Sequence, residues 1–83
     1  MPPRGKNKRT REQQLQDFRV VKMRRALMFL SRTTEGFTSK EIAAQVYLDH
    51  STVRANLAWL YKQLNAATNA QAVAAAFRKG LLK

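Results

Sequence analysis

Residues 36–64, GFTSKEIAAQVYLDHSTVRANLAWLYKQL, decide the fold. Thr38, followed three residues later by Glu41, fits the capping box, in which each side chain bonds the backbone of the other residue at a helix start. Asp49 is a residue type favoured at the N-cap and predicts a second helix start. The stretch therefore predicts a short helix, a turn of about three or four residues and a longer helix over residues 50–64, which is typical of a helix-turn-helix unit.

The longer helix has one narrow apolar stripe, whose members lie within about 40° of one another at 100° per residue. The stripe consists of Val53, Leu57, Leu60 and Leu64. The buried face expected for the shorter helix consists of Ile42, Ala43 and Val46. The longer helix points Arg54, Ala55, Ala58 and Lys62 away from its stripe. We therefore expect one side of this helix to face the core and the other to face solvent or a ligand.

Two further helices are predicted around this unit. The first should begin between Arg11 and Asp17 and end where residues 31–36 break the pattern. Its apolar stripe is expected to consist of Val20, Met23, Leu27 and Leu30, widened by Met28 and Phe29. The last helix should start at a second capping box, Thr68 to Gln71, and end before Gly80. Its apolar face is expected to consist of Ala70, Val73, Ala74 and Phe77. No segment shows strand alternation, so we predict an all-α, four-helix domain.

The charge of the chain is concentrated near its start. Sixteen Lys and Arg against five Asp and Glu give a net charge of +11, and residues 1–25 hold nine of the basic residues and two of the acids. We therefore predict a basic flexible arm over residues 1–16 and a helix-turn-helix domain over residues 17–83. A polyanion, above all double-stranded DNA, is the expected partner.

Several classes of protein are disfavoured by the residues. The chain has no cysteine, and its apolar runs are far shorter than the ~20 residues that span a bilayer. The sequence does not show the motifs of an enzyme or a metal site: there is no carboxylate pair, no nucleophile beside a base, no metal-ligand cluster and no phosphate-binding loop. We expect a protein that is not an enzyme, takes no cofactor or metal, does not bind membranes and is cytoplasmic, associated with the nucleoid.

The helix over residues 50–64 is expected to lie in the major groove as the recognition helix, with Arg54 as the main base-contacting residue. Helix N-termini favour anions, so the start of the shorter helix is expected to meet phosphate. The predicted DNA-binding residues of the domain are Ser39, Lys40, Ser51, Thr52, Arg54, Ala55, Asn56, Ala58 and Lys62. Those of the arm, which would follow the phosphate backbone or enter the minor groove, are Arg4, Lys6, Lys8, Arg9 and Arg11.

Trp59 lies off the apolar stripe of its helix. Three explanations are open: it is covered by the first helix or its N-terminal extension, it belongs to a partner surface, or it stacks on a DNA sugar.

The residues from Gly36 to Leu82 resemble the LuxR/GerE-type DNA-binding domain of bacterial and phage regulators. The resemblance is carried by the run from Gly36 to Ala43, by Val46 and Leu48, by Thr52-Val53-Arg54, by Leu57, Leu60-Tyr61 and Leu64, and by Ala72-Val73 and Gly80-Leu81-Leu82. It implies a four-helix domain that binds operator DNA, in a stand-alone form without a sensor domain.

The resemblance also implies roles for individual residues. Arg54 takes the place of the lysine that follows Thr-Val in the family, and Asn56 replaces its usual histidine. Lys40, Thr52 and Asn56 would contact phosphates, while Arg54, Ala55 and Ala58 would face the bases. The family implies a homodimer through the last helix, for which the expected interface residues are Ala72, Val73 and Ala76.

Two other functions remain open. The first is an architectural, excisionase-like protein that shapes DNA with little base preference. The second is a protein-interaction module that binds and inhibits another regulator or RNA polymerase, and RNA polymerase is also a possible partner of a transcriptional regulator.

Overall fold

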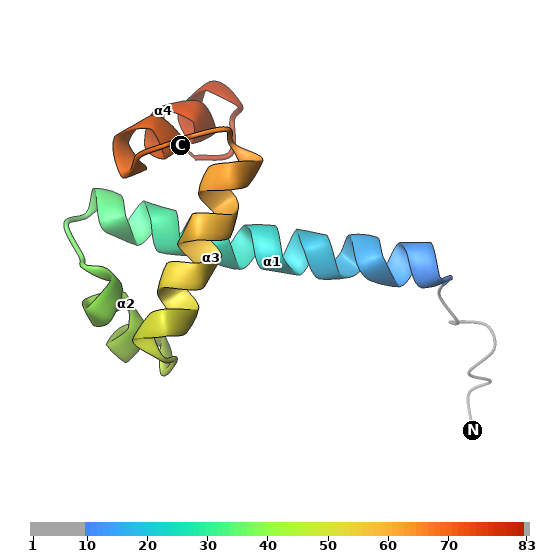
Figure 1. The fold of residues 1–83 in the computed structure, drawn as a ribbon, viewed down its shortest axis with the longest axis horizontal. Coiled ribbons are helices and arrows are strands. Elements are labelled where there is room, and N and C mark those ends of the chain that lie inside the picture. The colour runs from blue at the N-terminus through green and yellow to red at the C-terminus, as the bar shows by residue number, and fades with distance from the viewer. Residues whose placement is uncertain (1–9, 83) are drawn as a thin grey trace.

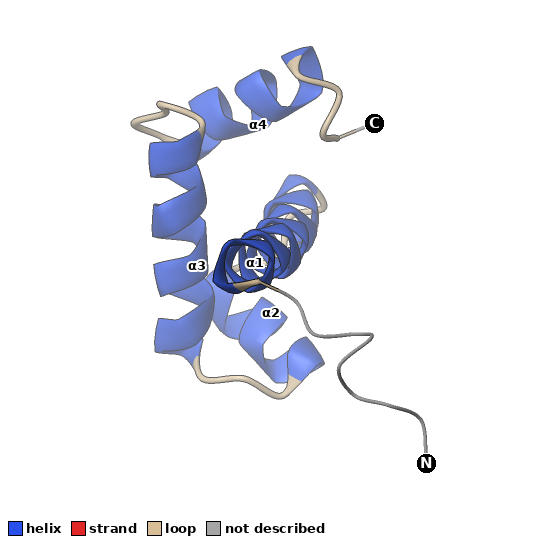
Figure 2. Cartoon of the chain, turned by 90° about the vertical axis from the view of Figure 1, so that its right-hand side faces the viewer, coloured by secondary structure: helices blue, strands red, loops and turns tan. Residues whose placement is uncertain are grey.

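The computed structural model describes residues 10–82, which form four helices and no strand. These are α1 (Arg11–Thr34), α2 (Ser39–Val46), α3 (His50–Gln63) and α4 (Asn69–Arg78) (Figure 1). α1 packs against all three other helices, and α3 also contacts α2 and α4. In Figure 2, which looks roughly along α1, α3 lies on the left of α1, α4 above it and α2 below it. The all-α, four-helix prediction is confirmed.

The helix-turn-helix unit forms as its caps predict. The Thr38 hydroxyl accepts a hydrogen bond from the Glu41 amide at 3.2 Å, and the Glu41 carboxylate accepts one from the Thr38 amide at 3.0 Å. Hydrogen bonds from Thr38 to the carboxylate, first from its backbone amide and then from its side chain, lower the pKa of Glu41 below its ordinary value, because they stabilise the charged form at the helix start. Tyr47 ends α2 in the left-handed conformation, with φ of 58°. Asp49 occupies the N-cap of α3 with extended backbone, but its side chain makes no capping hydrogen bond.

The core lies where α3 meets α1 and α2. The predicted stripe of α3 is buried, and Ile42 and Ala43 of α2 are buried against it. From α1 the buried side chains are Ala26, Phe29 and Leu30. This packing fixes the face of α3 that points inward, so the opposite face points outward.

The apolar face of α1 differs from the prediction. Val20 and Met28 are exposed, whereas Ala26 is fully buried. Only the C-terminal half of α1 lies inside the bundle, so Val20 has no neighbour to cover it (Figure 1). Ala26 belongs to the core cluster instead, although the predicted stripe did not include it.

The face of α4 also differs. Ala72, Ala75 and Ala76 are buried, whereas Ala70, Ala74 and Phe77 are exposed. Of the predicted face, only Val73 packs against the core, where it is partly buried. Gly80 follows the helix with φ of 73°, as expected for a C′ glycine. Thr68 caps Gln71, but the Gln71 side chain bonds the amide of Ala67 in place of Thr68.

The C-terminal end of α1 extends beyond its predicted limit, whereas its start lies within the predicted range. Residues 31–34, expected to break the helix, continue it, and the hydroxyls of Thr33 and Thr34 donate to carbonyls three residues earlier. At the other end α1 starts at Arg11, after a capping box formed by Thr10 and Gln13. Residues 11–16, assigned to the arm from the sequence, are thus helical, and the arm boundary does not coincide with a helix boundary. None of the helices in residues 10–82 has the length and hydropathy needed to cross a membrane.

Candidate nucleic-acid interface

One face of α3 is free of packing within the described residues. Its exposed side chains are Ser51, Arg54, Ala55, Ala58 and Lys62. They lie opposite the buried stripe, on the side of α3 that points away from α1 (Figure 2). α3 contains no Asp or Glu, so the two charged groups on this face, Arg54 and Lys62, are both cations.

The start of α2 lies beside this face. Ser39 lines one hollow together with Arg54, Leu57, Ala58 and Tyr61. Lys40 follows Ser39 and is exposed. The amides at a helix start carry partial positive charge, so this hollow adds to the cationic character of the α3 face. Ser39 and Arg54, which are far apart in sequence, are therefore brought to one surface.

Thr52 and Asn56 lie elsewhere on α3. Both are half-buried, and the Asn56 side-chain amide donates to the Thr52 carbonyl at 2.8 Å. Asn56 lines a hollow with Phe18 and Lys22 of α1. It therefore borders α1 and does not belong to the outward face with Arg54.

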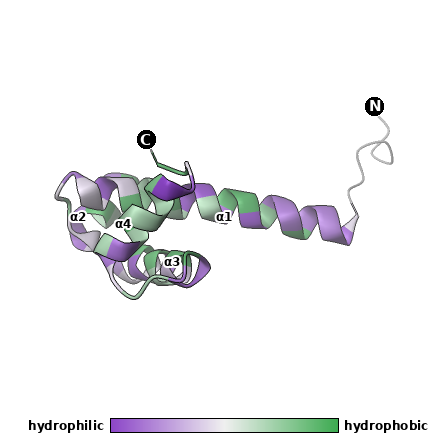
Figure 3. Ribbon diagram, turned by 90° about the horizontal axis from the view of Figure 1, so that it is seen from above, coloured by the Kyte–Doolittle hydropathy of each residue, from purple (hydrophilic) through white to green (hydrophobic). Residues whose placement is uncertain are grey.

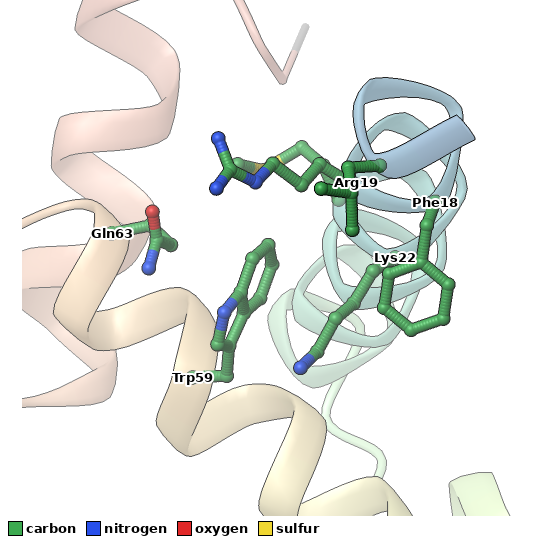
Figure 4. A pocket seen from close by; sticks show the side chains of 7 residues that line it. Phe18, Arg19, Lys22, Trp59 and Gln63 are labelled. Carbon is green, nitrogen blue, oxygen red and sulfur yellow. The ribbon is translucent and has the colours of Figure 1, made fainter. Parts of the chain in front are cut away.

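Trp59 packs against α1. The ring is half-buried, and the Lys22 ammonium lies 4.7 Å from the ring centroid, within cation–π distance (Figure 4). Of the explanations open for Trp59, cover by the first helix is the one the structure confirms. The contact between Lys22 and the Trp59 indole thus connects α1 to α3.

The basic arm is represented by one residue, because Arg4, Lys6, Lys8 and Arg9 lie outside the described residues. Arg11 is exposed at the first position of α1.

The residues expected at a dimer interface are not freely exposed on α4: Ala72 and Ala76 have no exposed surface, and Val73 is half-buried. The first two pack inside their own chain, which corrects their assignment to an interface.

Sequence reasoning missed three side-chain hydrogen bonds between helices. The Asn69 amide donates to the Thr33 hydroxyl at 3.1 Å and to the Tyr61 hydroxyl at 3.0 Å, which joins α4, α1 and α3. Arg32 donates to the Gln45 side chain at 2.7 Å, which joins α1 to α2. Because the two partners of each bond lie on different helices, no local sequence pattern predicts these bonds.

The chain matches a family described as bacterial regulatory proteins, luxR family (GerE), over residues 24–76, more than half of its length. No curated protein and no solved structure matches it. The matched residues contain the helix-turn-helix unit, the exposed face of α3 and the start of α4. The family consists of DNA-binding regulators and not of enzymes. The chain therefore belongs to the luxR family of bacterial regulatory proteins and is a DNA-binding transcription regulator.

Proposed function

We propose that the regulator binds double-stranded DNA with α3 in the major groove and Arg54 as its base-contacting residue. The observation that carries this proposal is the composition of the outward face: one long donor, Arg54, lies next to the small residues Ala55 and Ala58. Small side chains let the helix axis approach the groove floor, and a guanidinium there is able to bond both acceptors of a guanine edge.

The phosphate contacts come from residues around this face. Ser39 and Lys40 at the start of α2, and Ser51 and Thr52 in the first turn of α3, contact one strand. Arg11 and the arm residues before it contact the backbone on the other side of the site. If five to seven cations neutralise phosphates, the slope of log K against log salt is about −4 to −6.

Two copies bind together. The exposed side of α4, which includes Ala70, Ala74 and Phe77, supplies the contact between copies. Because a two-fold dimer places its recognition helices about one helical turn apart, the operator is an inverted repeat with half-sites about 10 base pairs apart. The dimer binds DNA inside the cell, at the nucleoid.

The experiment is selection of bound duplexes from a random-sequence pool at physiological salt, followed by sequencing. An enriched inverted repeat with this spacing supports a dimeric, sequence-specific regulator. An enriched single half-site supports α3 recognition but contradicts the dimer. Salt-sensitive binding without any enriched motif contradicts the proposal and favours an architectural DNA-binding protein.

A further inference from the structure

The half of α1 that leaves the bundle carries an apolar face on which no described element packs. Leu15, Phe18 and Val21 are 54%, 66% and 59% exposed and recur at three-residue steps, so they share one side of the helix. Figure 3 shows hydrophobic segments on α1 where it leaves the other helices. Helices in proteins gain most of their stability by burying such a face. This part of α1 also precedes residue 24, where the family match begins.

The apolar face continues into hollows between α1 and α3. Phe18 and Lys22 border two of them. The first extends to Leu15 and Met23 on α1 and to Trp59 on α3 (Figure 4). The second extends to Val21, Arg25 and Asn56. We call the surface formed by both hollows the α1 groove. It has an aromatic side chain from each helix, Phe18 and Trp59, of the kind that anchors small interfaces.

The charges around the α1 groove decide what fits it. Arg19, Lys22 and Arg25 line the hollows, and no Asp or Glu does. A second copy of the chain that met this surface with its own groove would bring the same three cations to it, which like-charge repulsion opposes. An apolar segment flanked by carboxylates meets both the apolar floor and the cationic rim.

We propose that the α1 groove binds an amphipathic, acidic helix of a partner protein. The apolar stripe of the partner packs on Phe18 and Trp59, and its flanking carboxylates pair with Arg19, Lys22 and Arg25. This is the helix-in-groove mode of recognition. With few apolar side chains on the floor, the interface falls at the small end, below about 1,200 Å² in total, where transient complexes lie. The proposal stands apart from DNA binding, because the groove lies on the α1 side of α3 and not on its outward face.

The test uses a synthetic helical peptide that lacks tryptophan, with leucines at i, i+3, i+4 and i+7 and glutamates on either side of this stripe. Trp59 is the one tryptophan of the chain, so its emission reports occupancy of the groove directly. We expect a saturable shift of the emission with Kd in the micromolar range. We expect no shift with the same peptide carrying lysine in place of each glutamate.

Matched variants separate the groove from general charge attraction. Phe18→Ala should weaken peptide binding about tenfold or more, because anchors dominate small interfaces. Val20→Ala removes another exposed apolar side chain of α1 that lines neither hollow, and it should bind as the parent does. Both side chains are largely exposed, and circular dichroism checks that the helix content is kept.

Three results would overturn the proposal. Equal affinities of the Phe18→Ala and Val20→Ala variants would show that the peptide is held by charge alone. A shift of Trp59 emission with protein concentration, together with a dimer in sedimentation that Phe18→Ala abolishes, would identify a second copy as the occupant. A shift produced by phosphatidylglycerol vesicles and not by the peptide would identify an anionic membrane.

Discussion

The two halves of α1 have different surroundings. The C-terminal half lies inside the bundle and buries Phe29 completely, whereas the N-terminal half projects outward (Figure 1) and leaves Phe18 two-thirds exposed. Both halves carry apolar residues at helical spacing. The difference shows that the spacing of apolar residues predicts which residues share a face of a helix. Whether that face is buried depends on the neighbouring helices.

Two phenylalanines on this one helix give the sharpest contrast. Phe29→Ala should lower the free energy of unfolding by about 3–5 kcal/mol, because it leaves a cavity in the core. Phe18→Ala should change it by about 0.5 kcal/mol or less, as at most surface positions. Urea denaturation followed by circular dichroism measures both. Equal losses would mean that the projecting half is packed in solution.

Enlarging side chains tests the same contrast from the other side. Ala26→Leu should destabilise the fold by about 1–3 kcal/mol, because the fully buried position has no room for a larger side chain. Val21→Leu, on the exposed face, should leave the melting temperature nearly unchanged. A neutral Ala26→Leu would contradict the tight packing of the core around this position.

The two capping boxes extend the comparison to the helix ends. Thr38→Ala should cost about 1 kcal/mol of global stability, because α2 packs into the core. Thr10→Ala removes an equivalent hydrogen bond, 3.1 Å long, from the projecting end. It should instead speed hydrogen exchange of the first amides of α1, because that segment opens locally without unfolding the domain. Native-state hydrogen exchange distinguishes the two outcomes, and a global loss for both variants would argue against independent opening.

The smallest effect concerns pH. Since the hydrogen bonds from Thr38 lower the pKa of Glu41, its carboxylate stabilises the fold when ionised. That contribution is present above the ordinary pKa of 4.5 and is lost as the pH falls through the lower, folded value. Glu41→Gln keeps a capping side chain but cannot titrate, so the stability of the parent should fall more steeply below about pH 4.5. Parallel pH profiles for the two proteins would contradict this.

The helix-turn-helix unit was predictable because its determinants are local. Thr38, Glu41 and the stripe from Val53 to Leu64 each act within one helix or one cap, and all are confirmed. The faces of α1 and α4 were predicted only in part, because burial there depends on helices distant in sequence. Leu30 is buried as expected, but Ala26 and Ala76, which neither predicted face included, are buried as well.

In the candidate site, too, features that depend on one helix could be predicted from the sequence, and features that depend on two helices could not. The exposure of Arg54, Ala55 and Ala58 could be derived from the stripe opposite them. The position of Asn56 beside α1 could not, because it depends on the crossing of α1 with α3. The hydrogen bond from Asn69 to Tyr61 could not be predicted either, because a polar contact between helices leaves no periodic pattern in the sequence.

The central claim is that the outward face of α3 distinguishes DNA sequences. Its most direct test measures Arg54→Ala against the selected operator and against random duplex DNA of equal length, with Arg78→Ala on α4 as a charge-matched control. We predict a loss of about 1–3 kcal/mol on the operator, a much smaller loss on random DNA, and little discrimination lost in the control. Equal losses of Arg54→Ala on both duplexes would contradict the account, because Arg54 would then contact phosphates and not bases.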